Sequence, residues 1–261
     1  MDDPTPYWGF SERQWTRSGL TLAEGNTLAR RLLASSLVPE AVHCLEAHYA
    51  EFTVLAAGRC PVQVLSQAEM DRWAGFSFHR GVIAVAHRPA PLTLEAFLAG
   101  PARRLAVAPR LTDPENLGAL YRSALALGWD AVAVGRESCD PFSRRCAKVS
   151  MGAVYAHPPV QLPDSLVAMQ KLFGQAGWTT VVLALEEGAL PLEVWRESPA
   201  GRTARAGKLA VWVGNEFEGL SPTERLQGSI PLVLPMAEGH DSLNASVAAS
   251  VALYRLASAQ E

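Results

Sequence analysis

The sequence predicts an α/β protein in two parts, a small α/β unit followed by a larger domain built on a mostly parallel sheet. A chain of 261 residues with 49% hydrophobic residues is long enough to bury one large core or two ordinary ones. In the second part, short apolar runs alternate with longer segments of helical periodicity, which is typical of a parallel sheet covered by helices. Proline and glycine cluster between the two parts. We therefore expect an extension over residues 1–18, a small unit over 19–87, a linker over 88–102 and a second domain over 103–261.

The charge balance limits the classes of partner. A net charge of −3 and a pI of about 6.1 argue against nucleic-acid binding through bulk positive charge. Residues 101–150 are the exception, with eight Lys/Arg against five Asp/Glu. This segment holds Arg110, Arg122, Arg144, Arg145 and Lys148, so a local basic site stays open.

The cysteines and the N-terminus indicate a reducing compartment. None of the four cysteines belongs to a C-x-x-C pair or has zinc-ligand spacing, so we expect free thiols and no metal. The chain starts with acidic residues and contains no long apolar run. We therefore expect no signal peptide, no membrane span and a cytoplasmic location.

The first part combines an aromatic extension with short elements. The extension carries Arg13 and Arg17, and it is either a docking arm or a segment folded onto the domain. The spacing predicts a helix over residues 20–35, with Arg30 and Arg31 on its exposed side. Strands are expected at residues 42–45, 52–55, 62–65 and 82–86, and a short helix is expected at 94–98 in the linker. Ser66 and Glu69 have the spacing of a capping box that opens another short helix.

The second part alternates strands and helices. The predicted strands are residues 105–108, 131–134, 180–185, 209–213 and 230–234, and the predicted helices are 115–127, 164–175 and 244–257. Ligands of such sheets bind outside the carboxyl ends of the strands. Polar loops that follow strands are therefore the candidate site.

Three loops stand out. In the first, Asp113 is a good N-cap, Pro114 suits the first helical position, and Asn116 and Arg122 follow on the same helix. In the second, Gly214 and Gly219 flank Glu216, and glycine permits close approach of a ligand. In the third, Ser242 or Asn244 caps a helix with an alanine stripe, which lets a backbone or a flat ligand come close. For each loop an ordinary helix start, polar turn or core helix is the alternative explanation.

The motifs that are missing narrow the function. There is no G-x-G-x-x-G after a strand and no G-x-x-x-x-G-K-[ST], so an ordinary dinucleotide or triphosphate site is not expected. There is also no G-x-S-x-G elbow and no H-E-x-x-H helix.

Taken together, the three loops resemble the motifs of the SpoU family of RNA ribose 2′-O-methyltransferases, in the SPOUT superfamily. The first motif corresponds to residues 113–124, the second to 214–220 with the strand ending at Leu234-Pro235-Met236, and the third to 242–248. Residues 20–86 more loosely resemble the ribosomal-protein-like RNA-binding domain of family members that act on ribosomal RNA. Glu24-Gly25 and Arg80-Gly81-Val82 are the best matches there.

The resemblance implies a C-terminal trefoil knot, S-adenosylmethionine as cofactor, and a homodimer whose site is completed across the interface. It also implies the site residues. The catalytic set is Arg122, Asn116, Glu216, Ser242 and Asn244, and the cofactor set is Gly214, Leu234, Leu243, Leu185 and Asn244. Contacts to RNA are expected from Arg13, Arg17, Arg30, Arg80, Arg144 and Arg145.

The expected chemistry is methyl transfer to a ribose 2′-hydroxyl, without a metal. An arginine is a poor base because its guanidinium stays charged, so Arg122 is expected to orient phosphate and stabilise the forming alkoxide. Ribosomal RNA is the favoured substrate. Transfer RNA, methylation of a base, and a non-catalytic RNA-binding or ribosome-binding protein with the same fold are the alternatives.

Overall fold

The computed structural model describes residues 10–74, 76–215, 220, 225–239 and 242–257. Its internal contacts divide the chain into two compact units, residues 1–90 with 140–157, and residues 91–139 with 158–261. The segment 140–157 thus groups with the first unit, although it lies within the stretch 103–261 that we expected to form one domain. The assignment of a separate function to each expected domain stays a prediction.

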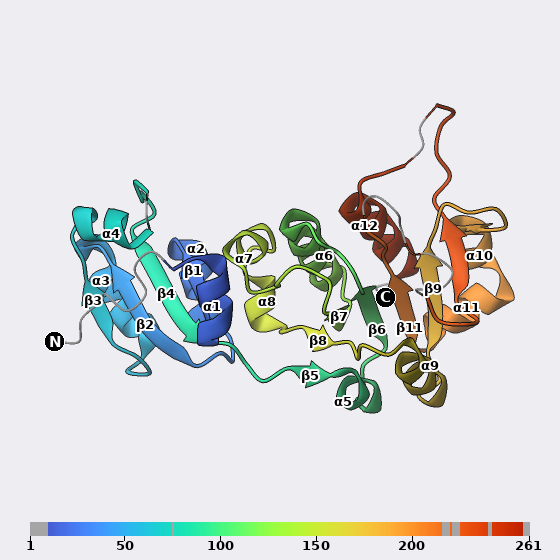
Figure 1. Cartoon of the computed structure of the whole chain (residues 1–261), viewed down its shortest axis with the longest axis horizontal. Helices are drawn as coiled ribbons and strands as arrows, with labels where there is room; N and C mark the ends of the chain where they lie inside the picture. The colour runs from blue at the N-terminus through green and yellow to red at the C-terminus, as the bar shows by residue number, and fades with distance from the viewer. Residues whose placement is uncertain (1–9, 75, 216–219, 221–224, 240–241, 258–261) are drawn as a thin grey trace. The chain divides into compact units, whose positions relative to one another are not determined.

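The first unit is built on a four-stranded sheet in the order β1-β4-β2-β3 (Figure 1). The strands are β1 (Leu20–Glu24), β2 (Pro39–Cys44), β3 (Val62–Val64) and β4 (Val82–His87). β4 pairs antiparallel with β1 and β2, and β2 pairs parallel with β3. The helices of this unit are α1 (Glu12–Ser18), α2 (Asn26–Ala34), α3 (Glu46–Ala56), α4 (Gln67–Ala74), α7 (Arg144–Val149) and α8 (Ala153–Ala156).

Two expectations for this unit were wrong. The predicted helix over residues 20–35 begins with a strand, because Leu20–Glu24 pairs with β4 and Gly25, at φ +89°, separates it from α2. The predicted strand over residues 52–55 lies inside α3, where Phe52 is fully buried. Both errors concern runs of only a few residues, in which tertiary pairing outweighs local propensity. The capping box is confirmed, since the Glu69 carboxylate accepts hydrogen bonds from both the backbone amide and the hydroxyl of Ser66 (2.7 Å each).

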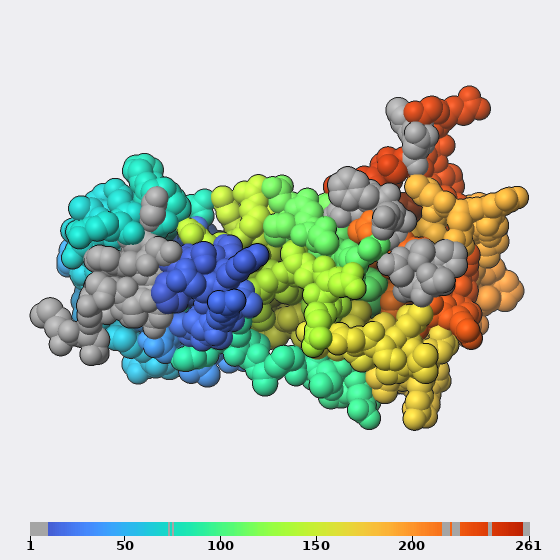
Figure 2. Space-filling model, in the orientation of Figure 1, coloured from blue at the N-terminus to red at the C-terminus, as the bar shows by residue number. Residues whose placement is uncertain are grey.

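Within the N-terminal extension, the structure describes residues 10–18, and these are folded onto the first unit. Trp15 of α1 is buried in the same core cluster as Leu22 and Ile83. The polar residues of α1 lie on the surface, where the helix forms the dark blue patch of Figure 2. The packing of Trp15 favours the second of the two interpretations of this extension.

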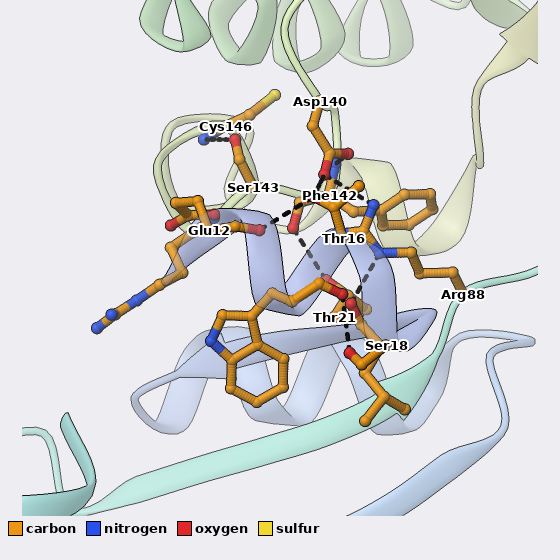
Figure 3. Close-up of polar contacts among 12 residues, drawn as sticks. Glu12, Thr16, Ser18, Thr21, Arg88, Asp140, Phe142, Ser143 and Cys146 are labelled. Carbon is orange, nitrogen blue, oxygen red and sulfur yellow. Dashed lines mark hydrogen bonds and ion pairs between the residues drawn. The ribbon is translucent and has the colours of Figure 1, made fainter. Parts of the chain in front are cut away.

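Asp140 fastens the returning segment to the first unit (Figure 3). One carboxylate oxygen accepts hydrogen bonds from the Thr16 hydroxyl (2.8 Å) and from the Arg88 guanidinium (2.7 Å). Nearby, the Thr21 hydroxyl donates to the Phe142 carbonyl (3.1 Å). Because these partners come from α1, β1 and the end of β4, the segment is held by contacts that are distant in sequence.

The second unit contains an eight-stranded sheet in the order β10-β12-β9-β11-β6-β7-β8-β5, and all its pairs are parallel. The strands are β5 (Leu92–Thr93), β6 (Arg104–Ala108), β7 (Ala131–Val134), β8 (Val160–Gln161), β9 (Thr179–Leu183), β10 (Leu190–Pro191), β11 (Leu209–Trp212) and β12 (Ile230–Val233). The helices are α5 (Leu94–Ala99), α6 (Pro114–Ala126), α9 (Leu166–Gln175), α10 (Leu192–Glu197), α11 (Pro199–Ala206) and α12 (Ala245–Leu256). The predicted parallel sheet is confirmed, and each of the five predicted strands overlaps an observed one.

The central strands are buried on both faces. Alternate residues such as Val107 and Trp212 form one core with α5 and α9. Helices α6 and α12 pack against each other (Figure 1). Leu120 on α6 and Leu253 on α12 are fully buried. The Trp129 indole nitrogen donates to the Leu253 carbonyl (3.1 Å), which ties the end of α12 to the loop between α6 and β7. No helix within the described residues is long and apolar enough to span a bilayer.

Candidate active site

The site lies at the carboxyl edge of the second sheet. Strands β12, β9, β11 and β6 are parallel neighbours, so the residues that follow them emerge at the same edge. Leu185 follows β9, Gly214 follows β11 and Leu234 follows β12. The fold therefore gathers three of the predicted cofactor-binding positions without further assumptions.

The first motif forms the start of α6. The Asp113 carboxylate caps the helix by accepting from the Glu115 amide (2.8 Å), and Pro114 occupies the first helical position. Asn116 lies in this first turn and is only 4% exposed. Its side-chain nitrogen lies 3.5 Å from a carboxylate oxygen of Asp113.

The third motif forms the start of α12. Of the two candidate caps, Asn244 caps the helix, because its side-chain oxygen accepts from the amides of Ser246 (3.0 Å) and Val247 (3.3 Å). The side-chain nitrogen of Asn244 donates to the side-chain oxygen of Asn116 (2.9 Å), 128 residues away in sequence. The cap fixes which end of the Asn244 amide faces Asn116, so the two motifs are joined by a directional hydrogen bond.

The alanine stripe of α12 packs closely on its neighbours. Ala249 and Ala252 are fully buried, and the Ser250 hydroxyl donates to the Ser123 hydroxyl on α6 (2.8 Å). Small side chains allow two helices to pack closely. The close packing expected from the stripe is thereby observed.

Arg122 is not part of this cluster. It is exposed on α6 and makes no hydrogen bond or ion pair with any residue that the structure describes. Six residues of an α-helix turn through about 600°, so Arg122 points roughly 120° away from Asn116. Ser242 is exposed beside the α12 cap, and Glu216 lies outside the described residues.

The loops at this edge suit S-adenosylmethionine in their donor set. Leu185 and Leu243 are 61% and 43% exposed, which provides apolar surface for an adenine ring. Gly214 is buried, and within the described residues no backbone hydrogen bond involves the main chain of Gly214, Leu234 or Leu243. Apolar side chains beside uncommitted backbone groups are what a nucleoside derivative needs.

The arginines expected to bind RNA differ in their surroundings. Arg30 pairs with Glu51 (2.7 Å), and Arg80 lies 3.7 Å from Glu24. Arg144 also pairs with Glu24 and is half-buried. Arg13, Arg17 and Arg145 are exposed. Ion pairs at the surface contribute little to stability, so Arg30 can exchange its partner for phosphate at small cost.

The sequence did not reveal a pocket that lies at the same edge. A cavity of about 370 Å³ lies where β6, β7 and β8 end. Its charged lining residues are Arg110, Arg136, Glu137 and Asp164. Of these residues, Arg136, Glu137 and Asp164 stand on loops without a recognisable motif. Only the order of the strands brings them together. The described residues contain no group of three or more side chains that would hold a metal ion.

Comparisons with known proteins agree with this geometry. Residues 104–254 match the model of the SpoU rRNA Methylase family. An uncharacterized tRNA/rRNA methyltransferase of Mycobacterium bovis is 32% identical, over 92% of this chain and 81% of its own length. The 23S rRNA (guanosine-2′-O-)-methyltransferase RlmB of Acinetobacter baylyi is also 32% identical, over 74% of this chain and 76% of its own.

Solved structures resemble the whole chain. A crystal structure described as an RNA 2′-O ribose methyltransferase has a TM-score of 0.72 and 28% identity, and covers 94% of this chain and 91% of its own. The SpoU methyltransferase AviRb from Streptomyces viridochromogenes, in complex with S-adenosylmethionine, has a TM-score of 0.77 at 22% identity and covers 94% and 92%. At that identity, AviRb supports the fold alone. By its motifs, its sheet and its family match, this chain belongs to the SpoU rRNA methylase family of S-adenosylmethionine-dependent RNA methyltransferases.

Proposed function

We propose that this chain transfers a methyl group from S-adenosylmethionine to a ribose 2′-hydroxyl, in ribosomal RNA. The hydrogen bond between Asn116 and Asn244 is the observation that carries the proposal, because it joins the first and third motifs. The relative from Acinetobacter baylyi, named as a 23S rRNA guanosine 2′-O-methyltransferase, supports both the sugar oxygen and the RNA class.

The cofactor would lie against the loops after β9, β11 and β12. Backbone groups of Gly214, Leu234 and Leu243 would hold its polar atoms, and Leu185 would cover the adenine. Asn244 would fix the position of the Leu243 backbone through its cap on α12. When bound, S-adenosylmethionine supplies an electrophilic methyl group on a sulfonium centre.

The remaining residues would position the RNA and stabilise the 2′-oxygen as it loses its proton. The 2′-hydroxyl loses a proton as its oxygen attacks, so negative charge develops on that oxygen. Arg122 would stabilise this charge or orient the adjacent phosphate, since its guanidinium stays protonated and cannot act as the base. Asn116 would anchor the ribose, while Glu216 and Ser242 would shape the pocket. The substrate phosphate is a candidate to receive the proton.

We further propose that the chain acts as a homodimer, with each site completed across the interface. Arg122 points away from Asn116 within one protomer, so a second copy is a suitable source of the arginine. Val247, Val251 and Tyr254 are exposed along one face of α12. An apolar stripe of this kind on a helix favours burial against a partner. The C-terminal trefoil knot expected from the family belongs to the same proposal.

The first unit would recruit the RNA. Arg13, Arg17, Arg30, Arg80, Arg144 and Arg145 are the proposed contacts. Because the net charge of the whole chain is −3, binding would depend on these local positive charges. Action on ribosomal RNA also places the proposed activity in the cytoplasm.

Mass spectrometry of nucleosides tests the proposal. RNA from cells with and without the gene is digested, and we expect one 2′-O-methylnucleoside in ribosomal RNA to depend on the gene. Loss of the modification from transfer RNA instead would support the substrate class that the mycobacterial relative's name includes. Base methylation in place of ribose methylation would contradict the proposal.

The Arg122→Ala variant tests the assigned roles. We expect it to lower methyl transfer by at least 100-fold, because a charge-stabilising group of the transition state typically contributes about 3–4 kcal/mol. Calorimetry should find cofactor binding unchanged, since Arg122 is not among the proposed cofactor contacts. Arg202→Ala, an exposed arginine on α11, is the matched control. Wild-type turnover by Arg122→Ala would contradict the assignment.

A further inference from the structure

The pocket at the ends of β6, β7 and β8 has the size of a binding site for one small ligand. Its volume of about 370 Å³ lies within the range of small-molecule sites. Leu162, Met169 and Leu220 contribute apolar walls. Arg110, Arg136, Glu137 and Asp164 contribute equal numbers of positive and negative charges. A pocket with balanced charge suits a neutral, flat, polar group better than a free phosphate.

The pocket lies next to the proposed site of methyl transfer. Trp212 of β11 is in register with Val107 of β6, and the Val213 amide donates to the Val107 carbonyl (2.8 Å). Continuing this register places Gly214, where the cofactor loop begins, opposite Pro109, which lines the pocket. Neighbouring strands are about 4.8 Å apart, so the two positions are separated by roughly one strand spacing.

The opposite wall of the pocket is the loop after β7, which lies close to the loop after β6. Ala108 is in register with Val134, and the Gly135 amide donates to the Ala108 carbonyl (3.0 Å). A Cβ atom at Gly135 would lie 2.1 Å from the Pro109 carbonyl oxygen, so the loops after β6 and β7 meet only because residue 135 is glycine. From Gly214 to Gly135 is about two strand spacings, or roughly 10 Å, which is comparable with the length of one nucleoside. Leu220, which follows β11 in the chain, also lines the pocket.

The two carboxylates of the pocket are not equivalent. Asp164 is paired with Arg136, with 3.0 Å between Nη1 and Oδ2. Glu137 is exposed at the pocket and has no ion-pair partner among the residues that the structure describes. A carboxylate accepts two parallel hydrogen bonds. Guanine is the RNA base with two adjacent donors on its Watson–Crick edge, the N1–H and the N2 amino group, so it complements a free carboxylate.

We propose that this pocket receives the base of the nucleotide being methylated, that the base is guanine, and that Glu137 selects it. Met169 and Leu220 would contact the faces of the base. This inference rests on the proposed function, since it requires the sugar of the same nucleotide to lie beside the cofactor loop. It assigns specificity to a loop outside the three family motifs.

A binding experiment tests the pocket independently of catalysis. The full-length protein is saturated with S-adenosylhomocysteine to fill the cofactor site, and guanosine and adenosine 5′-monophosphate are titrated against it by ligand-observed NMR. We expect a preference for the guanosine nucleotide that Glu137→Gln removes, because the amide replaces one acceptor oxygen with a donor. Glu95→Gln, an exposed glutamate on α5 that does not line the pocket, is the matched control and should keep the preference. Equal binding of both nucleotides by the wild type would overturn the assignment of guanine.

Methyl transfer provides the second measurement. We expect the wild type to form 2′-O-methylguanosine, and Glu137→Gln to lower kcat/KM by roughly 10- to 100-fold, the usual discrimination of a bidentate base contact. Affinity for S-adenosylmethionine and thermal unfolding should match those of Glu95→Gln. Wild-type kcat/KM in Glu137→Gln, or a methylated nucleoside other than guanosine, would overturn the inference while leaving the proposed function intact. A wild-type protein that methylates no RNA would instead refute the proposed function.

Discussion

Replacing Asn244 separates the two roles of this side chain. Its oxygen caps α12, and its nitrogen donates to the buried side-chain oxygen of Asn116. In Asn244→Ser, the hydroxyl can still cap the helix but is too short to reach Asn116. In Asn244→Ala, both interactions are lost. Comparing the two variants with the wild type therefore measures first the hydrogen bond to Asn116 and then the helix cap.

The magnitudes follow from burial. Asn116 is 4% exposed, and removing one partner of a buried hydrogen bond costs about 1–3 kcal/mol. Loss of an N-cap to alanine costs about 1 kcal/mol more. We expect the free energy of opening α12 to fall by about 1–3 kcal/mol in Asn244→Ser and by about 2–4 kcal/mol in Asn244→Ala.

Hydrogen exchange measured on a peptide covering α12 is the assay, because it reports local opening without requiring the whole chain to unfold. Calorimetry with S-adenosylmethionine should show weaker binding in both variants. In a double-mutant cycle, Asn116→Ala combined with Asn244→Ser should destabilise less than the sum of the single changes, since both remove the same bond. Wild-type exchange in Asn244→Ser, or strict additivity in the cycle, would refute the reasoning.

Three further predictions concern other parts of the chain. Gly135→Ala should lower the free energy of unfolding by about 1–3 kcal/mol, because the added Cβ atom has no room. Gly174→Ala should be neutral or stabilising, because a Cβ atom there would have nothing within 4 Å. Burial lowers the pKa of His43 to about 4, partly offset by a hydrogen bond with Gln63. As the pH falls, the His43 imidazole therefore binds a proton in the unfolded chain before it does so in the folded one. The free energy of unfolding should fall between about pH 6.5 and pH 4, by at most about 3 kcal/mol. His43→Gln should flatten that slope in acid-unfolding curves. Val251→Asp on α12 should convert the protein to monomers, as measured by light scattering. Val167 is exposed on α9, so Val167→Asp is the control and should leave the dimer intact. A monomeric wild type would contradict the homodimer.

The sequence by itself determined the local structure wherever the pattern was long or chemically specific. The runs 105–108, 131–134 and 209–212 are buried strands because their residues are apolar throughout, as a sheet covered on both faces requires. Asp113 and Asn244 start helices because a short polar side chain satisfies the free amides of the first turn. The three motifs were enough to indicate the family.

Only the tertiary structure decided which of these pieces meet. Residues 20–24 became a strand because β4 offered a partner, which no local pattern shows. The bond from Asn244 to Asn116 depends on α12 packing against α6, and Glu137 lines a pocket only because β6, β7 and β8 are neighbours in the sheet. Local propensity depends on residues a few positions apart, whereas the order of strands is set by burial summed over the whole chain. The positions that form the site could therefore be proposed from the sequence one loop at a time, but their assembly into one edge required the fold.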